Sequence, residues 1–326
     1  MPSRPRRSRP TGSAVAWAID GGAALLLLAV LVTYLTRQPA QASSSPFEYL
    51  GGTPRPTLTP VPTSFYLPTV TPNPLSTPVE DYSTPTPFGF SGGPAPRTIG
   101  YSALGEPIEN YTFGQGEQQY LIVAGIHGGY EGNTTDLANQ LVVYLAGHSE
   151  VIPSDATLYV IPAMNPDGAA RGRNVDARAN SNGVDLNRNF PSRNWVPDWD
   201  RGNCWNYRPT TGGQSGGSEP ETRAVMNFIG SHHLRAMISY HSAALGVFPG
   251  GDPWETASER LASTLADATN YPYPPIDIGC HYTGTLADWA VEHGVGAAVD
   301  MELSNHQDAD FTRNLGAVQA LLEFSE

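Results

Sequence analysis

The sequence predicts an α/β fold over residues 98–326, with a mixed, largely parallel sheet flanked by helices on both faces. Apolar strand-like runs alternate along this segment with amphipathic helical runs, which is typical of a parallel sheet whose strands are joined through helices. Three of the strand-like runs end in side chains capable of chemistry, at His127, His241 and Glu302. Ligands of such sheets bind beyond the carboxyl ends of the strands, so these three residues mark the expected site.

The first half of the segment contains two predicted strands and one predicted helix. The run QYLIVAGI (119–126) predicts a buried strand that ends at His127, and DLANQLVVYLAGH (136–148) has the periodicity of a helix. The run TLYVIP (157–162) predicts the next strand, and a long loop rich in glycine, asparagine and arginine follows it.

The second half repeats the alternation. SEPETRAVMNFIGSH (218–232) predicts a helix, and Ser218 and Glu221 have the spacing of a capping box at its start. RAMISY (235–240) predicts a strand that ends at His241, and PWETASERLASTLADAT (253–269) predicts the following helix. GAAVDMEL (296–303) predicts the last strand, which runs into Glu302, and a terminal helix closes the chain.

Three segments of different composition precede the α/β segment. Residues 1–13 are basic, and residues 14–36 contain an apolar stretch long enough to span a bilayer, which takes roughly 20 residues. The arginines ahead of this stretch predict a transmembrane signal anchor with a cytoplasmic N-terminus; AQA (40–42) resembles a cleavage site, so a cleaved signal peptide is the alternative. Residues 37–97, rich in serine, threonine and proline, predict a disordered stalk. Both alternatives place residues 98–326 outside the cell membrane, either tethered by a single-pass segment or secreted.

The charge distribution narrows the possible partners. The net charge is −13; five arginines against one aspartate give the first 37 residues a charge of +4, which leaves −17 for the rest. Nucleic acids and anionic membrane surfaces bind clustered basic residues, so we expect no nucleic acid partner, and membrane contact only through the N-terminal segment. Cys204 and Cys280 form no CxxC pair, which argues against a two-thiolate metal site and leaves one disulfide or two free thiols open.

The strand-end residues predict a metal site. His127 and Glu131 are close in sequence, on the turn between a strand and a helix, and His241 reaches them only through the fold. Zinc accepts histidine nitrogen and carboxylate oxygen, and a catalytic zinc has three protein ligands plus water. A single strand-end histidine is usually structural, but the combination indicates a metal ion.

The segment 98–326 resembles the zinc carboxypeptidases, that is, the carboxypeptidase A-like M14 metallopeptidases. The matching motifs follow in order over nearly the whole segment: HGGYEGN (127–133), NPDG (165–168), RANSNGVDLNRNFP (178–191), SEPETRA (218–224), SYHS (239–242), GTLADW (284–289) and MEL (301–303). GVDLNRNFP is the most specific of these motifs. The resemblance implies a zinc carboxypeptidase-like fold and the hydrolysis of peptide bonds.

The resemblance also implies roles around the metal. One zinc ion per chain would be held by His127, Glu131 and His241. Glu302 would be the general base that takes a proton from water, since a carboxylate on the same sheet edge can accept it. Arg178 matches the arginine that stabilises the oxyanion, and Arg171 and Arg173 are the alternatives for that role.

Substrate binding is assigned in the same way. Asn187 and Arg188 match the pair that grips the terminal carboxylate of the substrate, a task suited to a guanidinium fork. Tyr282 matches the tyrosine that caps the bound substrate, although Tyr271 or Tyr273 could serve instead.

Two positions depart from the family pattern. The family spaces its first two ligands as H-x-x-E, whereas Tyr130 occupies the usual place here and the glutamate follows one residue later. Glycines before it can absorb the extra residue, so Glu131 stays the predicted ligand. Ala243 replaces a tyrosine that often follows the third ligand. The remaining histidines are expected to be structural or exposed: His148, His232, His233, His281, His293 and His306. Of these, His281 and His306 could line the pocket rim.

The substrate stays open between two classes of peptide. Ala287 stands where the family sets side-chain preference, and a small neutral residue is compatible with apolar or bulky side chains. We expect a metallocarboxypeptidase acting on peptides. The alternative is a bacterial cell-wall peptidase that cleaves the γ-D-glutamyl–diaminopimelate bond of peptidoglycan stem peptides, since an exported bacterial enzyme would meet the wall first. The non-enzyme alternative is a cell-surface binding module that keeps the fold, and the sequence leaves the oligomeric state open.

Overall fold

The structure is a computed structural model that describes residues 93–197, 211–276, 279 and 281–325. The predictions for residues 1–13 and 14–36, and for nearly all of the stalk at 37–97, lie outside these residues, as do those for Cys204 and Cys280. Within the described part of the chain, no helix has both the length and the apolar character needed to cross a membrane.

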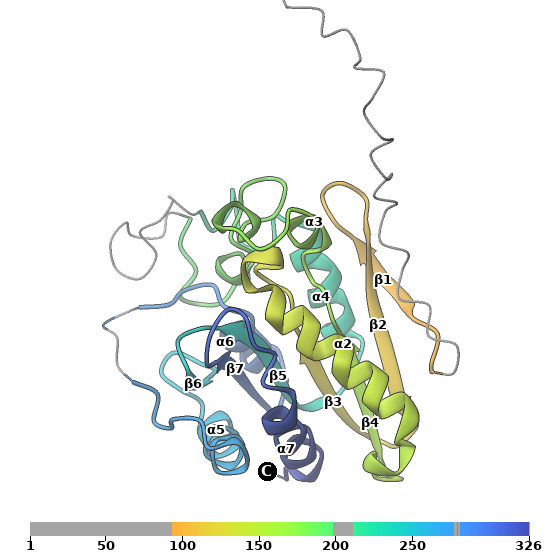
Figure 1. The fold of residues 1–326 in the computed structure, drawn as a ribbon. Coiled ribbons are helices and arrows are strands. Elements are labelled where there is room, and N and C mark those ends of the chain that lie inside the picture. Colours follow the sequence, from red (N-terminus) through yellow and green to blue (C-terminus); the bar gives the residue numbers. More distant parts are fainter. Residues whose placement is uncertain (1–92, 198–210, 277–278, 280, 326) are drawn as a thin grey trace, which may run out of the picture. The chain divides into compact units, whose positions relative to one another are not determined.

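One mixed sheet organises the described residues. Its seven strands lie in the order β1-β2-β4-β3-β5-β7-β6 (Figure 1). The four central strands are parallel: β4 (Ala156–Ile161), β3 (Gln118–Val123), β5 (Leu234–Ser242) and β7 (Ala297–Leu303). The predicted fold class is confirmed for this domain, because each central strand falls on an apolar run of the sequence.

The edges of the sheet are antiparallel and were not predicted. They are formed by β1 (Arg97–Tyr101), β2 (Pro107–Gly114) and β6 (Gly246–Pro249). The strand β6 has four residues and β2 carries polar residues within it, so neither shows the long apolar run that reveals a central strand. β2 and β6 pair with β4 and β7, which lie much farther along the chain, and β1 pairs with β2, the next strand.

Helices cover both faces of the sheet. On one face lie α2 (Gly132–Gly147), α5 (Thr256–Thr269) and α7 (Phe311–Glu323), whose apolar side chains share one core with β3, β5 and β7. On the other face lie α4 (Pro220–Gly230) and α6 (Leu286–Glu292), which belong to a second core. In Figure 1, α2 and α7 lie in front of the sheet and α4 lies behind it. Fully buried leucines such as Leu137 and Leu141 each contribute about 1.5–3 kcal/mol through burial.

Short helical turns fill the long connections above the sheet. They are η1 (Gly128–Glu131), η2 (Ser149–Val151), α3 (Pro166–Ala170), η3 (Val175–Ala177) and η4 (Leu186–Arg188). Except for η2, these turns follow the carboxyl ends of β3 and β4, which is where they can carry side chains toward a ligand.

The predicted capping box of α4 is wrong. The helix begins after Glu219, whose side chain makes no capping bond, and Ser218 donates to Glu219 instead. Glu221 is fully buried and accepts bonds from the backbone N–H of Ala103 and the side chain of Asn180. Its carboxylate therefore ties α4 to two distant loops rather than closing the helix end.

Candidate metal centre

Three neighbouring strands bring the strand-end residues together at the carboxyl ends of the parallel strands. His127 follows β3, directly before η1; His241 lies near the end of β5; and Glu302 lies opposite His241 on β7. Because these parallel strands are neighbours, residues separated by more than a hundred positions in sequence become adjacent.

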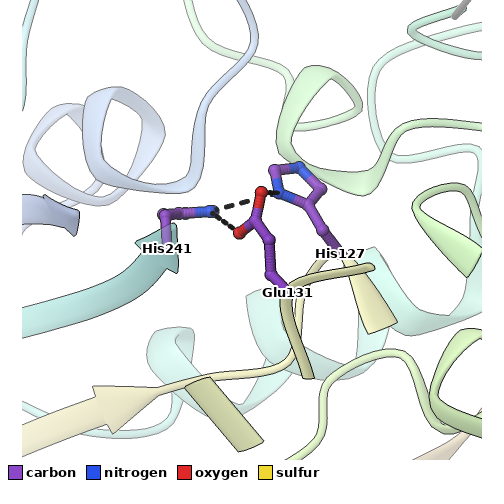
Figure 2. Close-up of side chains that lie close together, drawn as sticks. All are labelled: His127, Glu131 and His241. Atoms are coloured by element: carbon purple, nitrogen blue, oxygen red, sulfur yellow. Dashed lines mark hydrogen bonds and ion pairs between the residues drawn. The ribbon is translucent and has the colours of Figure 1, made fainter. Parts of the chain in front are cut away.

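His127, Glu131 and His241 form a compact buried group (Figure 2). The Nδ1 atom of His127 lies 2.7 Å from Oε1 of Glu131, and Nδ1 of His241 lies 3.2 Å from Oε2. One ligand atom from each residue falls within 4.8 Å of the others. Two imidazole nitrogens and one carboxylate oxygen match the donor set of a catalytic zinc, so these residues fit a zinc ion.

The outer nitrogen of each histidine faces a group that can hold its proton. Nε2 of His127 lies 3.0 Å from Oδ1 of Asp185. Nε2 of His241 lies 2.9 Å from Oγ of Ser239 and 3.6 Å from Oδ1 of Asp300. A proton held at Nε2 leaves the lone pair of Nδ1 directed toward the centre, which is the tautomer a metal ligand requires.

Charge also favours an ionised ligand. Burial alone would raise the pKa of Glu131, but the charges and hydrogen bonds of His127 and then His241, when these histidines are protonated, outweigh it and hold the pKa well below its ordinary value. Glu131 also accepts a bond from the backbone N–H of Ser242. The carboxylate is thus fixed and negative, as a metal ligand must be.

The extra residue between the first two ligands is accommodated by a tight turn. Gly128 has φ +49°, and a Cβ there would lie 2.6 Å from the backbone of Gly168; a Cβ on Gly129 would lie 2.2 Å from the carbonyl of Gly172. The turn η1 therefore packs backbone against backbone. The ring of Tyr130 lies 4.6 Å from that of His306, and the guanidinium carbon of Arg178 lies 5.9 Å from the centre of the Tyr130 ring.

Arg178 is the arginine closest to the metal group among the three considered. It is buried, and it donates to Glu131 (3.1 Å) and to Asp185 (3.0 Å). Burial opposes its charge, but the two carboxylates outweigh that and raise the pKa of Arg178. Arg171 binds the loop around Ser181, and Arg173 is an exposed residue paired with Asp136. Of the three arginines, Arg178 is therefore the one that contacts the metal group.

Glu302 lies close enough to the metal group to sense its charges. Its Oε2 accepts the backbone N–H of Ala244 at 3.0 Å. Burial, and after it the negative charge of Glu131, raises the pKa of Glu302. A carboxylate with a raised pKa is a stronger proton acceptor, which is the property a general base needs.

The predicted carboxylate-binding pair lies on η4. Arg188 is buried, its Nη1 donates to the carbonyl of Asn187, and its guanidinium stands over the ring of Tyr282 at 5.0 Å. The side chain of Asn187 is also engaged, since its Oδ1 accepts the backbone N–H of Leu286 and its Nδ2 donates to Asp300. Asn187 thereby braces the loop that carries Arg188.

Tyr282 lies nearest to this pair among the candidate tyrosines. Besides facing Arg188, it lies edge-on to Phe248 and lines a cavity next to the metal group. Burial, and then the charge of Glu302, raises the pKa of Tyr282, so its hydroxyl keeps its proton and can donate. Tyr271 instead donates to Asp310 within the core, and Tyr273 packs on that core.

Asp185, Ser239 and Asp300 lie behind the two histidines, and no role was predicted for them from the sequence. Asp185 is fully buried and belongs to the motif GVDLNRNFP, two residues before Asn187, so the motif contained a signal for it. Ser239 and Asp300 share the strand face of His241 and Glu302, because side chains two apart on a strand point the same way.

Comparisons with known proteins agree with this geometry. The family model described as zinc carboxypeptidase, Peptidase M14, matches residues 95–314. Murein peptide amidase A of Escherichia coli K12 is 29% identical over 205 residues, covering 61% of this chain and 77% of the relative. The same enzyme of Vibrio campbellii is 27% identical and covers 66% and 85%. The catalytic chain of mouse carboxypeptidase N is 37% identical over 130 residues, covering 37% of this chain and 28% of the relative.

Solved structures show the same fold. The crystal structure of murein-tripeptide amidase from Escherichia coli O157 superposes with a TM-score of 0.53 at 24% identity, covering 72% of this chain and 93% of that chain. Bovine thrombin-activatable fibrinolysis inhibitor, in complex with tick carboxypeptidase inhibitor, gives 0.56 at 20% identity, with 70% and 88% covered. The match over residues 95–314 confirms what the motifs predicted: the chain belongs to the zinc carboxypeptidase family, Peptidase M14, and is a metallopeptidase.

Proposed function

We propose that this chain is a zinc-dependent metallocarboxypeptidase, which hydrolyses the peptide bond before a residue that carries a free α-carboxylate. The observation that carries the proposal is the meeting of two features at one sheet edge: the buried group His127, Glu131 and His241, and the guanidinium of Arg188 held beside Tyr282. The first fits one zinc ion per chain. The second offers a planar cation to a carboxylate.

The residues divide the work of hydrolysis between them. A zinc ion, when bound, supplies an activated water and polarises the scissile carbonyl. Glu302 is placed to take the proton of the attacking water as the new C–O bond forms. It then returns that proton to the amide nitrogen as the C–N bond breaks. Arg178 is placed to stabilise the negative charge on the carbonyl oxygen, and Arg188 holds the terminal carboxylate, so that only a terminal peptide bond reaches Glu302.

A peptidoglycan stem peptide is the second candidate substrate. Two of the relatives are named murein peptide amidase A, and the match covers 77% and 85% of their length, against 28% for carboxypeptidase N. This chain therefore matches most of the length of the murein peptide amidases, but a much smaller share of carboxypeptidase N. The predicted signal anchor or signal peptide at 14–36 and the stalk at 37–97 would place such an enzyme outside the membrane, where the wall lies.

The test uses the full chain, purified in detergent and loaded with zinc. It is offered a peptide with a free C-terminal carboxylate, the same peptide amidated, and the tripeptide L-alanyl-γ-D-glutamyl-diaminopimelate, with products read by mass spectrometry. Glu302→Gln should lower kcat by about 10²- to 10⁴-fold, the range for a lost general base. Glu323→Gln is the matched control on an exposed helix face and should behave as wild type.

The products distinguish the carboxypeptidase from the cell-wall peptidase and from a binding module. Release of the terminal residue from the free acid but not from the amide supports the carboxypeptidase. Cleavage of the tripeptide alone supports the cell-wall peptidase. Equal cleavage of acid and amide refutes the role of Arg188, and binding of zinc and peptides without cleavage refutes the enzyme and leaves a binding module.

A further inference from the structure

A separate cavity of about 380 Å³ opens on the face of the sheet that α4 covers. Its floor is formed by β1, β2 and β4, which are neighbours at one side of the sheet (Figure 1). Its wall is formed by the last turn of α4 and the residues directly after it. The lining residues that matter for binding are Arg97, Asn110, Thr112, Tyr159, Phe228 and His232.

This cavity lies far from the metal group. His232, in its wall, is two residues before Leu234, the first residue of β5, whereas His241 lies near the carboxyl end of that strand. From 234 to 241 is seven residues, which is roughly 23 Å at about 3.3 Å per residue. Among the described lining residues, none belongs to the metal group or to the proposed site for the terminal carboxylate.

A positive charge stands at this cavity without a counter-charge. Arg97 is exposed on β1, and its guanidinium makes no ion pair or hydrogen bond within the described part of the chain. Burial raises the pKa of Tyr159, and the charge of Arg97 opposes that rise, which shows that the guanidinium lies near the tyrosine. The described lining residues include no carboxylate. An anion in the cavity would therefore meet a cation and no opposing charge.

A buried hydrogen-bond acceptor lies beside this cation. Asn110 is opposite Arg97 in the pairing of β1 with β2, so the two side chains share one face of the sheet. Asn110 is 2% exposed, and its Nδ2 donates to Oγ1 of Thr112 at 3.1 Å. Its Oδ1 is buried and accepts no hydrogen bond from the described residues. Because a buried acceptor without a donor is unfavourable, a ligand that brings a donor would be stabilised here.

Aromatic rings complete the wall. The ring of Tyr159 stands edge-on to those of Phe228 and His232, with ring centres 5.3 Å and 4.6 Å apart. His232 is held in place because its Nδ1 donates to the carbonyl of Phe228 at 2.6 Å. These rings favour contact with an apolar or aromatic group.

We propose that this cavity binds the C-terminal residue of a peptide, at a second site separate from the metal centre. The carboxylate would pair with Arg97, the N–H of the same residue would donate to Oδ1 of Asn110, and an apolar side chain would pack on Tyr159. A terminal residue carries its N–H and its carboxylate on one carbon, which suits two side chains at facing positions of a strand pair. A free amino acid fits less well, because its ammonium would lie near Arg97 with no carboxylate to receive it. This inference does not depend on the proposed function.

Photocrosslinking of the zinc-loaded full chain in detergent tests this site. The probe is N-acetyl-4-benzoyl-L-phenylalanine, which has the carboxylate, the N–H and an aromatic side chain; the chain carries Glu302→Gln so that the probe is not hydrolysed. Mass spectrometry of the digested chain should find an adduct within residues 97–112 or 227–232. Adding Arg97→Gln should lower the yield of this adduct about 10-fold at subsaturating probe, as expected for a lost charged hydrogen bond. Arg260→Gln, at an exposed arginine on α5, is the matched control and should leave the yield unchanged.

Competitors test the two polar contacts without altering the protein. N-acetyl-L-phenylalanine should suppress the adduct. Its amide, which lacks the carboxylate, and its N-methyl derivative, which lacks the N–H, should each be about 10-fold weaker competitors. In a chain with Glu302 intact, Arg97→Gln should hydrolyse a free-acid peptide with the same kcat/KM as wild type, since Arg97 is remote from the metal group.

Several results would overturn the inference. These are the absence of an adduct in the two segments, an undiminished yield with Arg97→Gln, and equal competition by the amide. Stronger competition by 3-phenyllactate, which has a hydroxyl in place of the N–H, would assign the site to a hydroxy acid and exclude the peptide. A fall in kcat/KM with Arg97→Gln would contradict the separation from the metal centre.

Discussion

Asp185 joins the metal group to the buried arginine, so Asp185→Asn is a direct test of the network. Asp185 is fully buried, and its carboxylate accepts from Nε2 of His127, from Nε of Arg178 and from the backbone N–H of Asn187. These partners hold the pKa of Asp185 well below its ordinary value against the effect of burial. Asparagine keeps the size of the side chain and removes its charge, which leaves Arg178 with Glu131 as its charged acceptor.

The expected size of the effect follows from the burial. Breaking a buried ion pair costs about 3–5 kcal/mol, and we expect about 3 kcal/mol because Arg178 keeps Glu131. For a domain of this size, 1 kcal/mol corresponds to a shift of about 2–4 °C in Tm, so the metal-free chain should melt roughly 6–12 °C lower. Zinc affinity should fall about 10- to 100-fold, since Asp185 orients a ligand histidine.

The assay is thermal unfolding of the metal-free full chain in detergent, followed by tryptophan fluorescence. Asp136→Asn is the matched control, since it removes an exposed aspartate–arginine pair and should change stability by at most about 1 kcal/mol. Zinc affinity is measured in parallel by competition with a chelator. If Asp185→Asn melts within a degree or two of Asp136→Asn and binds zinc as tightly as wild type, the network has no such role and the reasoning is refuted.

Three further predictions concern substrate binding, the loss of thermal stability at low pH, and the hydrophobic core. Arg188→Lys replaces a fork with a point charge, so KM for a free-acid peptide should rise roughly 10-fold with a smaller change in kcat; an unchanged KM would contradict the assignment. The pKa of Glu219 is lowered because bonds from Ser218, Asn180 and Asn182 outweigh burial, so its stabilisation is present above pH 4.5 and is lost as the pH falls through the folded-state pKa. Glu219→Gln should therefore flatten the decline of Tm on acidification, and parallel curves for the two proteins would refute this. Leu141→Ala should lower stability by about 2–5 kcal/mol, and Val143→Ala, on the exposed side of the same helix, by at most about 1 kcal/mol; similar losses in a denaturant titration would count against the packing described.

The central strands and their helices could be predicted because local pattern and burial agree there. The runs ending at His127, His241 and Glu302 are apolar over several residues, and each proved to be a strand or its immediate extension. The edge strand β6 was not predicted because its four residues, Gly246–Pro249, are too few to show such a pattern. It becomes a strand through its pairing with β7. The predicted capping box of α4 was wrong because the carboxylate of Glu221 accepts hydrogen bonds from Ala103 and Asn180 in distant loops instead.

The three candidate metal ligands could be named from the sequence, but the residues that hold them in place could not. Strand ends pointed to His127 and His241, and the resemblance to the zinc carboxypeptidases supplied the full set His127, Glu131 and His241. Which carboxylate stands behind each histidine depends on the path of the loops, since Asp185 is 58 residues away from His127. Asp300 was read only as part of the last strand, because its approach to His241 appears once the strand register is known.

The most direct test of the account is zinc stoichiometry measured with activity. Full chain and His241→Ala are dialysed against a weak chelator, analysed for zinc by mass spectrometry, and assayed on a peptide with a free C-terminal carboxylate before and after zinc is added back. We expect one zinc per chain in wild type, activity that disappears with the metal and returns with it, and neither zinc nor activity in His241→Ala. Activity that survives complete removal of zinc, or a full complement of zinc in His241→Ala, would contradict it.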